Sequence, residues 1–250
     1  MKLETARQLS TDLARLLGLR GHMVAIRYLK TPPEIPKVSA SVVACQAIQD
    51  ARFGKTTILT KTNSKCLGAS YFLGFEALSP LAYDFWIENE QSLYDGDAAQ
   101  TMVQSLPGPP LGFGDNVLFE PLSQSSVEPD LVLIVGNPEQ IARLLGLHIF
   151  KSGEPVMIYS YGATCQSTVG IPITTGRANV SFIDLPSRKI ARFEPTEQVL
   201  SVPYTDLHDM LASVTQSING TGNPRFNRKG LPYLSGEWCL PESGQETCDE

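Results

Sequence analysis

Three cysteines have the chemistry and the placement of a metal or redox site. Cys45, Cys66 and Cys165 each lie at a joint between a predicted strand and a predicted helix. Thiolates bind soft metals, and three of them can hold a 4Fe–4S cluster with one iron left open. Helix N-termini also favour thiolates, and Cys45 and Cys66 stand near predicted helix starts. We therefore expect the three thiols to hold an iron–sulfur cluster for redox or sulfur-related chemistry on a small molecule.

Other uses of these cysteines stay open. Zinc is a competing metal, but the sequence contains neither a Cys-x-x-Cys pair nor histidines at ligand spacing. Because cysteine is also a small buried hydrophobe, the chain is alternatively a non-catalytic binding or assembly module with structural cysteines. A third interpretation is a cysteine-dependent enzyme without metal, with Cys66 or Cys165 as its nucleophile. Cys239 and Cys248 lie apart from the others, and we expect them to be free surface thiols.

Four further residues are candidates to line a cleft beside the thiols. Gln46 and Gln166 directly follow two of the cysteines. Gly68 begins a run of small residues that would let a cluster approach the backbone. Arg27 lies in the middle of an apolar strand and is a candidate to meet an anion there, although a strand arginine more often faces solvent.

Two segments share a pattern that predicts a degenerate internal duplication. Each contains a strand, a Cys-Gln pair, a glycine followed by a basic residue, and another strand, at residues 24–59 and 156–183. Coincidence is the simpler explanation, since short patterns recur by chance. In a true duplication, both Cys-Gln pairs would face one cleft between pseudo-symmetric halves.

Composition and charge narrow the class of protein. The chain has 250 residues and a net charge of −6, with no cluster of lysine or arginine, which argues against nucleic acid and anionic membranes as partners. A small-molecule ligand fits better. Residues 1–21 form an amphipathic pattern rather than a signal peptide, and no apolar run reaches membrane-spanning length. We expect a cytoplasmic protein with reduced cysteines.

The elements that must position the thiols are those of one α/β or α+β domain. We expect a mixed β-sheet with helices packed on it over residues 1–235, followed by a flexible tail at 236–250. The clearest unit is a buried strand, a turn and a helix within residues 129–156. Other strands are predicted at 23–29, 55–61, 156–162, 179–185 and 188–194, and other helices at 41–54, 83–90, 95–106 and 202–220.

The order of several blocks resembles the uncharacterised proteins catalogued as domain of unknown function 169. These blocks are VAIRYL, ACQAI, KCLGASYFLGF, PDLVLIVGNPEQIARLL, ATCQSTVG and SRKIARFEPTEQVLSVP, and they span roughly residues 10–215. The resemblance implies a compact mixed α/β domain and draws attention to the cysteines at 45, 66 and 165, but it carries no assigned reaction. Other members often have a cysteine and a glycine before the arginine that corresponds to Arg188, whereas LPSRK in this chain lacks that cysteine.

Overall fold

The computed structural model describes residues 2–31, 43–159 and 162–222. Its strands form one sheet in the order β2-β3-β1-β4-β6-β5, and every neighbouring pair is antiparallel. The predicted fold class, a β-sheet with helices packed on it, is confirmed, but the strand directions are all antiparallel rather than mixed. The strands are β1 (Val24–Leu29), β2 (Thr57–Thr60), β3 (Asn116–Pro121), β4 (Leu131–Gly136), β5 (Asn179–Ser181) and β6 (Gln198–Pro203).

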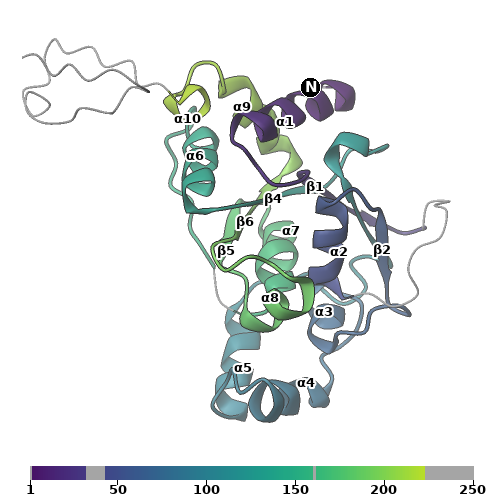
Figure 1. Ribbon diagram of the computed structural model, residues 1–250. Helices are drawn as coiled ribbons and strands as arrows, with labels where there is room; N and C mark the ends of the chain where they lie inside the picture. Colours follow the sequence, from purple (N-terminus) through teal and green to yellow (C-terminus); the bar gives the residue numbers. More distant parts are fainter. Residues whose placement is uncertain (1, 32–42, 160–161, 223–250) are drawn as a thin grey trace, which may run out of the picture.

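Helices lie on both sides of this sheet. Figure 1 shows α1, α6, α9 and α10 at the top of the view and α3, α4 and α5 at the bottom, with the sheet between them. In the described ranges, no helix is both long enough and apolar enough to cross a membrane. The α-helices are α1 (Leu3–Leu16), α2 (Ala44–Arg52), α3 (Leu67–Phe72), α4 (Pro80–Asp84), α5 (Gly96–Ser105), α6 (Pro138–His148), α7 (Ile171–Thr175), α8 (Leu185–Ala191), α9 (Tyr204–Ser213) and α10 (Ile218–Thr221). The shorter turns are the π-helices η1 (Phe85–Asn89) and η3 (Gln166–Gly170) and the 3-10 helix η2 (Leu122–Gln124).

The strand order has a two-fold symmetry. Exchanging β1 with β4, β2 with β5 and β3 with β6 turns the order β2-β3-β1-β4-β6-β5 into its own reverse. The axis passes between β1 and β4, where Val24 is paired with Leu133. This is the order that a duplicated unit of three strands would produce. The symmetric counterpart of β1 is β4, however, and not the segment 156–162 that the sequence pattern suggested.

Alternate residues along the central strands contribute to two separate cores. On β1, Val24 and Ile26 pack with α2, whereas Ala25 packs with α1 and α6 on the opposite face. This period of two is what a strand buried on both sides requires. We call the face that packs with α2, α3, α5 and η3 the thiol face, because its core contains Cys45 and Cys165 with Cys66 packed against it.

Two predicted strands are wrong. Residues 156–159 make no ladder hydrogen bonds in the sheet, and 160–161 lie outside the described residues. Residues 188–194 were expected to form a strand, but helix α8 runs through Ala191. Its start is fixed by Asp184, whose carboxylate accepts a hydrogen bond from Ser187 N at 2.7 Å. A helix cap therefore prevails over the alternating pattern of the RKIARFE segment.

Two strands were missed. β3 follows directly after a loop rich in proline and glycine. β6 ends at Pro203, whereas the sequence predicted that a helix begins at residue 202. Both have almost wholly buried residues and therefore no alternating polar pattern. The tail predicted at 236–250 lies outside the described residues.

A buried ion pair fixes α2 to the second half of the sheet. Arg52 Nη2 lies 2.5 Å from Glu197 Oε1, and both side chains are buried. Burial alone would raise the pKa of Glu197, but the hydrogen bond from Arg52, the N–H of Glu194 and the charges of Arg52 and Arg20 together outweigh burial and lower the pKa. Gln49 Nε2 also donates to the carbonyl of Ala191, at the end of α8. The helix that carries Cys45 is thus held against α8 and the residue before β6.

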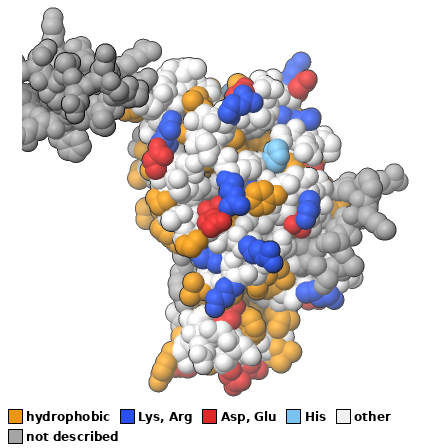
Figure 2. Space-filling view, in the orientation of Figure 1, with side chains coloured by type: hydrophobic (Ala, Val, Ile, Leu, Met, Phe, Trp, Pro, Cys, Tyr) orange, Lys and Arg blue, Asp and Glu red, His pale blue; other side chains and the backbone are white. Residues whose placement is uncertain are grey.

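Ion pairs on the surface are of a different kind. Arg20 Nη1 and Glu194 Oε1 are 2.8 Å apart, and Lys151 Nζ and Asp209 Oδ1 are 2.6 Å apart, but these side chains are largely exposed. Exposed pairs contribute little to stability. Figure 2 shows positive and negative side chains interspersed across one face of the molecule.

Gly170 allows η3 to approach α3. A Cβ atom at Gly170 would lie 2.6 Å from the carbonyl oxygen of Phe72, the last residue of α3. This contact brings the π-helix that follows Cys165 against the helix that follows Cys66.

We expect Gly170→Ala to lower the free energy of unfolding by about 1–3 kcal/mol, because the added methyl group overpacks a backbone contact. Urea denaturation would measure this change. Gly108→Ala is the matched control, since a Cβ atom there meets nothing within 4 Å. The control should change stability by less than about 0.5 kcal/mol. Equal stability of the two variants would contradict the close approach of η3 and α3.

Candidate functional site

The thiol face brings together the three cysteines that the sequence singled out. Cys45 is the second residue of α2, Cys66 precedes α3, and Cys165 directly precedes η3. Cys45 and Cys165 are only 8% and 6% exposed, whereas Cys66 is partly exposed. All three are free thiols. Three segments far apart in sequence thus deliver thiols to one core.

Cys66 occupies the N-cap position of α3. Its Sγ accepts a hydrogen bond from Ala69 N at 3.5 Å, a role that serine, threonine, asparagine or aspartate usually fills. The N–H of Gly68 also lies against this thiol and lowers its pKa. A Cβ atom at Gly68 would stand 3.6 Å from the rings of Phe72 and Trp86. The side of Gly68 on which another residue would carry its side chain therefore faces these aromatic rings.

Asp184 is the charged group most closely tied to the thiols. Its carboxylate accepts hydrogen bonds from N and Oγ1 of Thr164 at 2.6 and 2.5 Å. It accepts two more from N and Oγ of Ser187 at 2.7 and 2.9 Å. Thr164 is the neighbour of Cys165, and the Ser187 hydroxyl, which donates its proton to Asp184, also lies against the Cys45 thiol. Asp184 is thereby linked to two of the three cysteines.

The backbone before Asp184 is strained. Ile183 has a φ of 48°, in the left-handed region that β-branched residues rarely adopt. Ile183 is also buried. Strain of this kind costs about 1–3 kcal/mol and persists only where the surroundings enforce it. Here the turn directs the Asp184 side chain toward Thr164 and Ser187.

The electrostatic environment disfavours free thiolates. Burial raises the pKa of Cys45 to about 11, and the negative charges of Cys66 and Asp184 add to the shift. Burial raises the pKa of Cys165 well above its ordinary value, with contributions from Cys66, Asp184 and Cys45. Burial also raises the pKa of Cys66, to which Glu90 and Asp184 contribute. The thiols thus lie close enough to sense one another's charge.

Two polar side chains beside Cys165 complete the surroundings. The Tyr28 side chain is partly buried, and desolvation raises the pKa of its phenol, with a further contribution from the charge of Cys165. Gln166 is 1% exposed, and its buried Oε1 has no hydrogen-bond partner within the described residues. The glycine at 162 leaves room for this amide, because a Cβ atom there would lie 2.8 Å from Gln166 Oε1. A buried amide oxygen without a hydrogen-bond partner is unusual in a protein interior.

The other two cleft candidates are engaged elsewhere. Gln46 Nε2 donates to Asp50 Oδ1 at 3.1 Å, one turn along α2. Arg27 Nη1 lies 2.8 Å from Asp130 Oδ1, and its side chain is 39% exposed. The acceptor that meets Arg27 is therefore a carboxylate of the chain itself.

Sequence reasoning missed Asp184, Thr164, Ser187 and Tyr28. A signal for Asp184 was present, because Asp-Leu-Pro-Ser at 184–187 is typical of a helix start with an aspartate N-cap and an early proline. This signal was overlooked because residues 179–194 were interpreted as two strands. Tyr28 gave no comparable signal, since tyrosine is common in strands.

Among the described residues, the thiol face has no ready-made site for a single metal ion. Within the described part of the chain, no three Cys, His, Asp or Glu side chains are placed to hold one metal ion together. Metal–sulfur bonds are about 2.3 Å long, so two thiolates on one ion are at most about 4.6 Å apart. A cluster with several irons accepts thiols that are more widely spaced. Sulfur donors in an apolar setting also match iron–sulfur chemistry.

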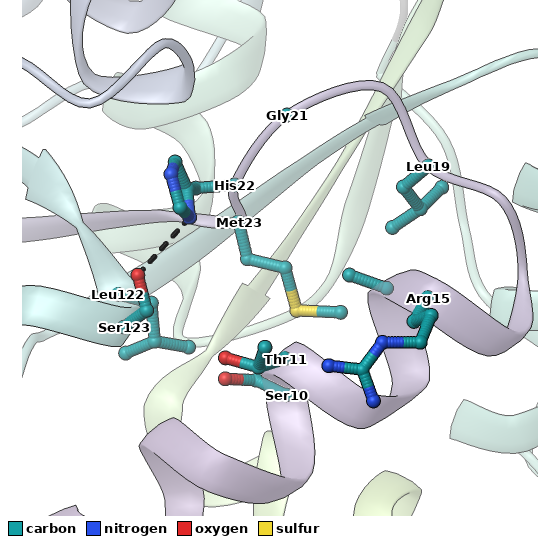
Figure 3. A pocket seen from close by; sticks show the side chains of 10 residues that line it. Ser10, Thr11, Arg15, Leu19, Gly21, His22, Met23, Leu122 and Ser123 are labelled. Atoms are coloured by element: carbon teal, nitrogen blue, oxygen red, sulfur yellow. Dashed lines mark hydrogen bonds between the residues drawn. The ribbon is translucent and has the colours of Figure 1, made fainter.

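A surface cavity of about 250 Å³ lies on the opposite face of the sheet (Figure 3). It is formed by α1, the segment leading into β1, and η2, with Met23 among its apolar lining. His22 Nδ1 and Ser123 Oγ are 3.0 Å apart at its edge, and Arg15 is paired with Asp12. His22 is thus hydrogen-bonded to Ser123, and Arg15 forms an ion pair with Asp12. No cysteine lines the cavity. The thiol face therefore remains the stronger candidate site.

In the metal-free protein, we expect iodoacetamide to modify Cys66 before Cys45 and Cys165, because Cys66 is the most exposed of the three. All three should react more slowly at neutral pH than an ordinary cysteine, since a raised pKa lowers the thiolate fraction. The rate at Cys45 should climb as the pH approaches about 11. Peptide mapping by mass spectrometry would measure each site, with the urea-unfolded protein as control. Rapid labelling of any of the three at pH 7 would contradict this environment and favour a nucleophilic thiol.

Comparisons with known proteins give a family match without a named activity. The model of the family described as Uncharacterised ArCR, domain of unknown function 169, matches residues 12–213. Uncharacterized protein MJ0308 of Methanocaldococcus jannaschii is 24% identical over 223 residues, which cover 86% of this chain and 95% of that protein. No solved structure matches the chain. The matched region contains all three cysteines of the thiol face and Asp184.

Proposed function

The chain belongs to the domain of unknown function 169 family, and we propose that it is a metalloprotein whose Cys45, Cys66 and Cys165 hold a 4Fe–4S cluster. The cluster would serve redox or sulfur-related chemistry on a small molecule. The observation that carries this proposal is the convergence of three free thiols from three distant segments on one face of the sheet. Such convergence is not needed for stability in a chain of this length, which can bury a sufficient core without it.

The charges around the thiols support a cationic occupant. Each cysteine has a raised pKa, and carboxylates contribute to each shift. Metal binding replaces the thiol protons, so a positively charged group would relieve the repulsion that disfavours three thiolates together. A lone nucleophilic cysteine needs the opposite environment, one that lowers its pKa. The metal-free enzyme is therefore the weaker alternative.

Each residue has a distinct task in this proposal. Buried Cys45 and Cys165 would anchor the cluster from α2 and from the start of η3, while Cys66 would close the more exposed side. With three thiolate ligands, the cluster would supply one iron that can bind a substrate or pass electrons. The Gln166 amide oxygen, which has no partner among the described residues and lies next to Cys165 in sequence, supports a small-molecule ligand with a hydrogen-bond donor. A cytoplasmic location would keep the thiols reduced.

The alternative of a binding module with structural cysteines also has a specific observation in its favour. Cys45 and Cys165 are as buried as their apolar neighbours and belong to the same core. In that case each thiol acts as a small hydrophobic side chain. The two proposals predict different colours and different metal contents for the purified protein.

We expect protein purified without oxygen to show broad visible absorption, with iron and acid-labile sulfide in the ratio of a 4Fe–4S cluster. Cys45→Ser, Cys66→Ser and Cys165→Ser should each lose most of this absorption and iron, because each removes a thiolate ligand. Cys239→Ser and Cys248→Ser are the controls and should keep both. Circular dichroism would establish that the variants remain folded.

A colourless, iron-free protein after anaerobic reconstitution would overturn the cluster and favour the binding module. Loss of absorption in the two control variants alone would show that the ligands lie in the last residues of the chain.

A further inference from the structure

The symmetry of the sheet assigns a counterpart to Cys66. β2 is followed by α3, whose N-cap is Cys66, and its symmetric partner β5 is followed by α8, whose N-cap is Asp184. Both side chains accept a hydrogen bond from the third residue of their helix, Ala69 and Ser187. Cys45 and Cys165 likewise stand on the segments that lead to β2 and β5. The two halves therefore supply four positions, of which three carry thiols and one a carboxylate.

The contacts of Asp184 place its charge beside the thiols independently of this symmetry. Its carboxylate is bonded to both N and Oγ1 of Thr164, which adjoins Cys165. It also accepts from the Ser187 hydroxyl that lies against Cys45. The carboxylate accepts four hydrogen bonds in all and is held in one orientation by two segments of the chain.

We propose that Asp184 is the fourth member of the thiol site and lowers the reduction potential of the cluster bound there. This inference rests on the proposed function, because it requires that a cluster is bound. Reduction adds one electron to the cluster, and a fixed negative charge nearby makes that addition less favourable. The electron donor that serves such a site must therefore be a strong reductant.

Other charges near the site do not cancel that of Asp184. Glu90 is a second carboxylate whose charge reaches Cys66. Lys65 adjoins Cys66 in sequence but does not contribute to the shift of its pKa. The guanidinium of Arg188 donates to the carbonyls of Ile183, Phe182 and Glu197 behind the turn. Arg188 does not contribute to the pKa shift of any of the three cysteines. The charged side chains that raise the pKa values of the thiols are thus carboxylates and the other thiols.

The test is a redox titration of the cluster-loaded full chain, followed by absorption or electron paramagnetic resonance. We expect Asp184→Asn and Asp184→Ser to raise the midpoint potential, giving on the order of tenfold more reduced cluster at a fixed potential, or about 59 mV for one electron. Asn and Ser both serve well as helix N-caps, so α8 keeps its start. Ser also avoids placing an NH₂ group among the donors of Thr164 and Ser187.

Asp184→Glu separates charge from structure. It disturbs the same turn but keeps the negative charge, so its potential should stay near that of the wild type. Glu139→Gln, an exposed position on α6 that touches none of the thiols, removes one negative charge elsewhere and should leave the potential unchanged.

Each outcome decides the inference. A midpoint potential that stays the same in Asp184→Asn and Asp184→Ser, with the cluster intact, would overturn the role of Asp184 and leave the proposed function standing. The same shift in Asp184→Glu as in Asp184→Asn would also overturn it, because the effect would then be structural. Absence of a cluster from the wild-type protein would instead overturn the proposed function itself.

Discussion

The antiparallel pairing of β1 with β4 is the constraint on which the rest of the molecule depends. It joins two three-stranded halves at the centre of one sheet, and the strand order on either side is symmetric about it. In an antiparallel central pair, a two-fold rotation about an axis perpendicular to the sheet relates the two halves. The same face of each half therefore lies on the same side of the sheet. The segments before β2 and β5 therefore meet on the thiol face. A shift of one residue in this register would move the inward side chains of one half to the opposite face.

On the thiol face, burial opposes the ionisation of the cysteine side chains. Cys45 and Cys165 are packed as tightly as core residues, and that packing makes their ionised forms expensive. The chain offsets part of this cost with N–H and hydroxyl donors at Cys66 and Cys45, but it also adds the carboxylate of Asp184. In a core built for packing alone, an aliphatic side chain would replace the thiol at no such cost. The proposed cluster would replace the thiol protons and so remove the cost of ionising the free thiols.

The sequence predicted the parts of this architecture that are encoded locally. The strand-turn-helix unit around Asn137 has a capping box, and β1 and α5 have clear patterns, so these elements were found. β4 was found from its continuous apolar run, whereas β3 and β6 were missed because the buried polar residues Asn116, Glu120 and Ser201 interrupt theirs. The three cysteines were identified by type and placement. Asp184 was not, because its role depends on a helix start that was interpreted as a strand, and on Thr164, twenty residues away.

The left-handed backbone at Ile183 has a consequence for how this site comes into being. An isoleucine leaves that conformation unless distant contacts compel it, so the turn before Asp184 cannot be stable in an isolated peptide. Its shape is enforced by Thr164 and by the packing of the whole second half. The position of the carboxylate is therefore a cooperative property of the folded domain. A chain that has opened even locally at this turn loses the arrangement altogether, so the site exists in full or not at all.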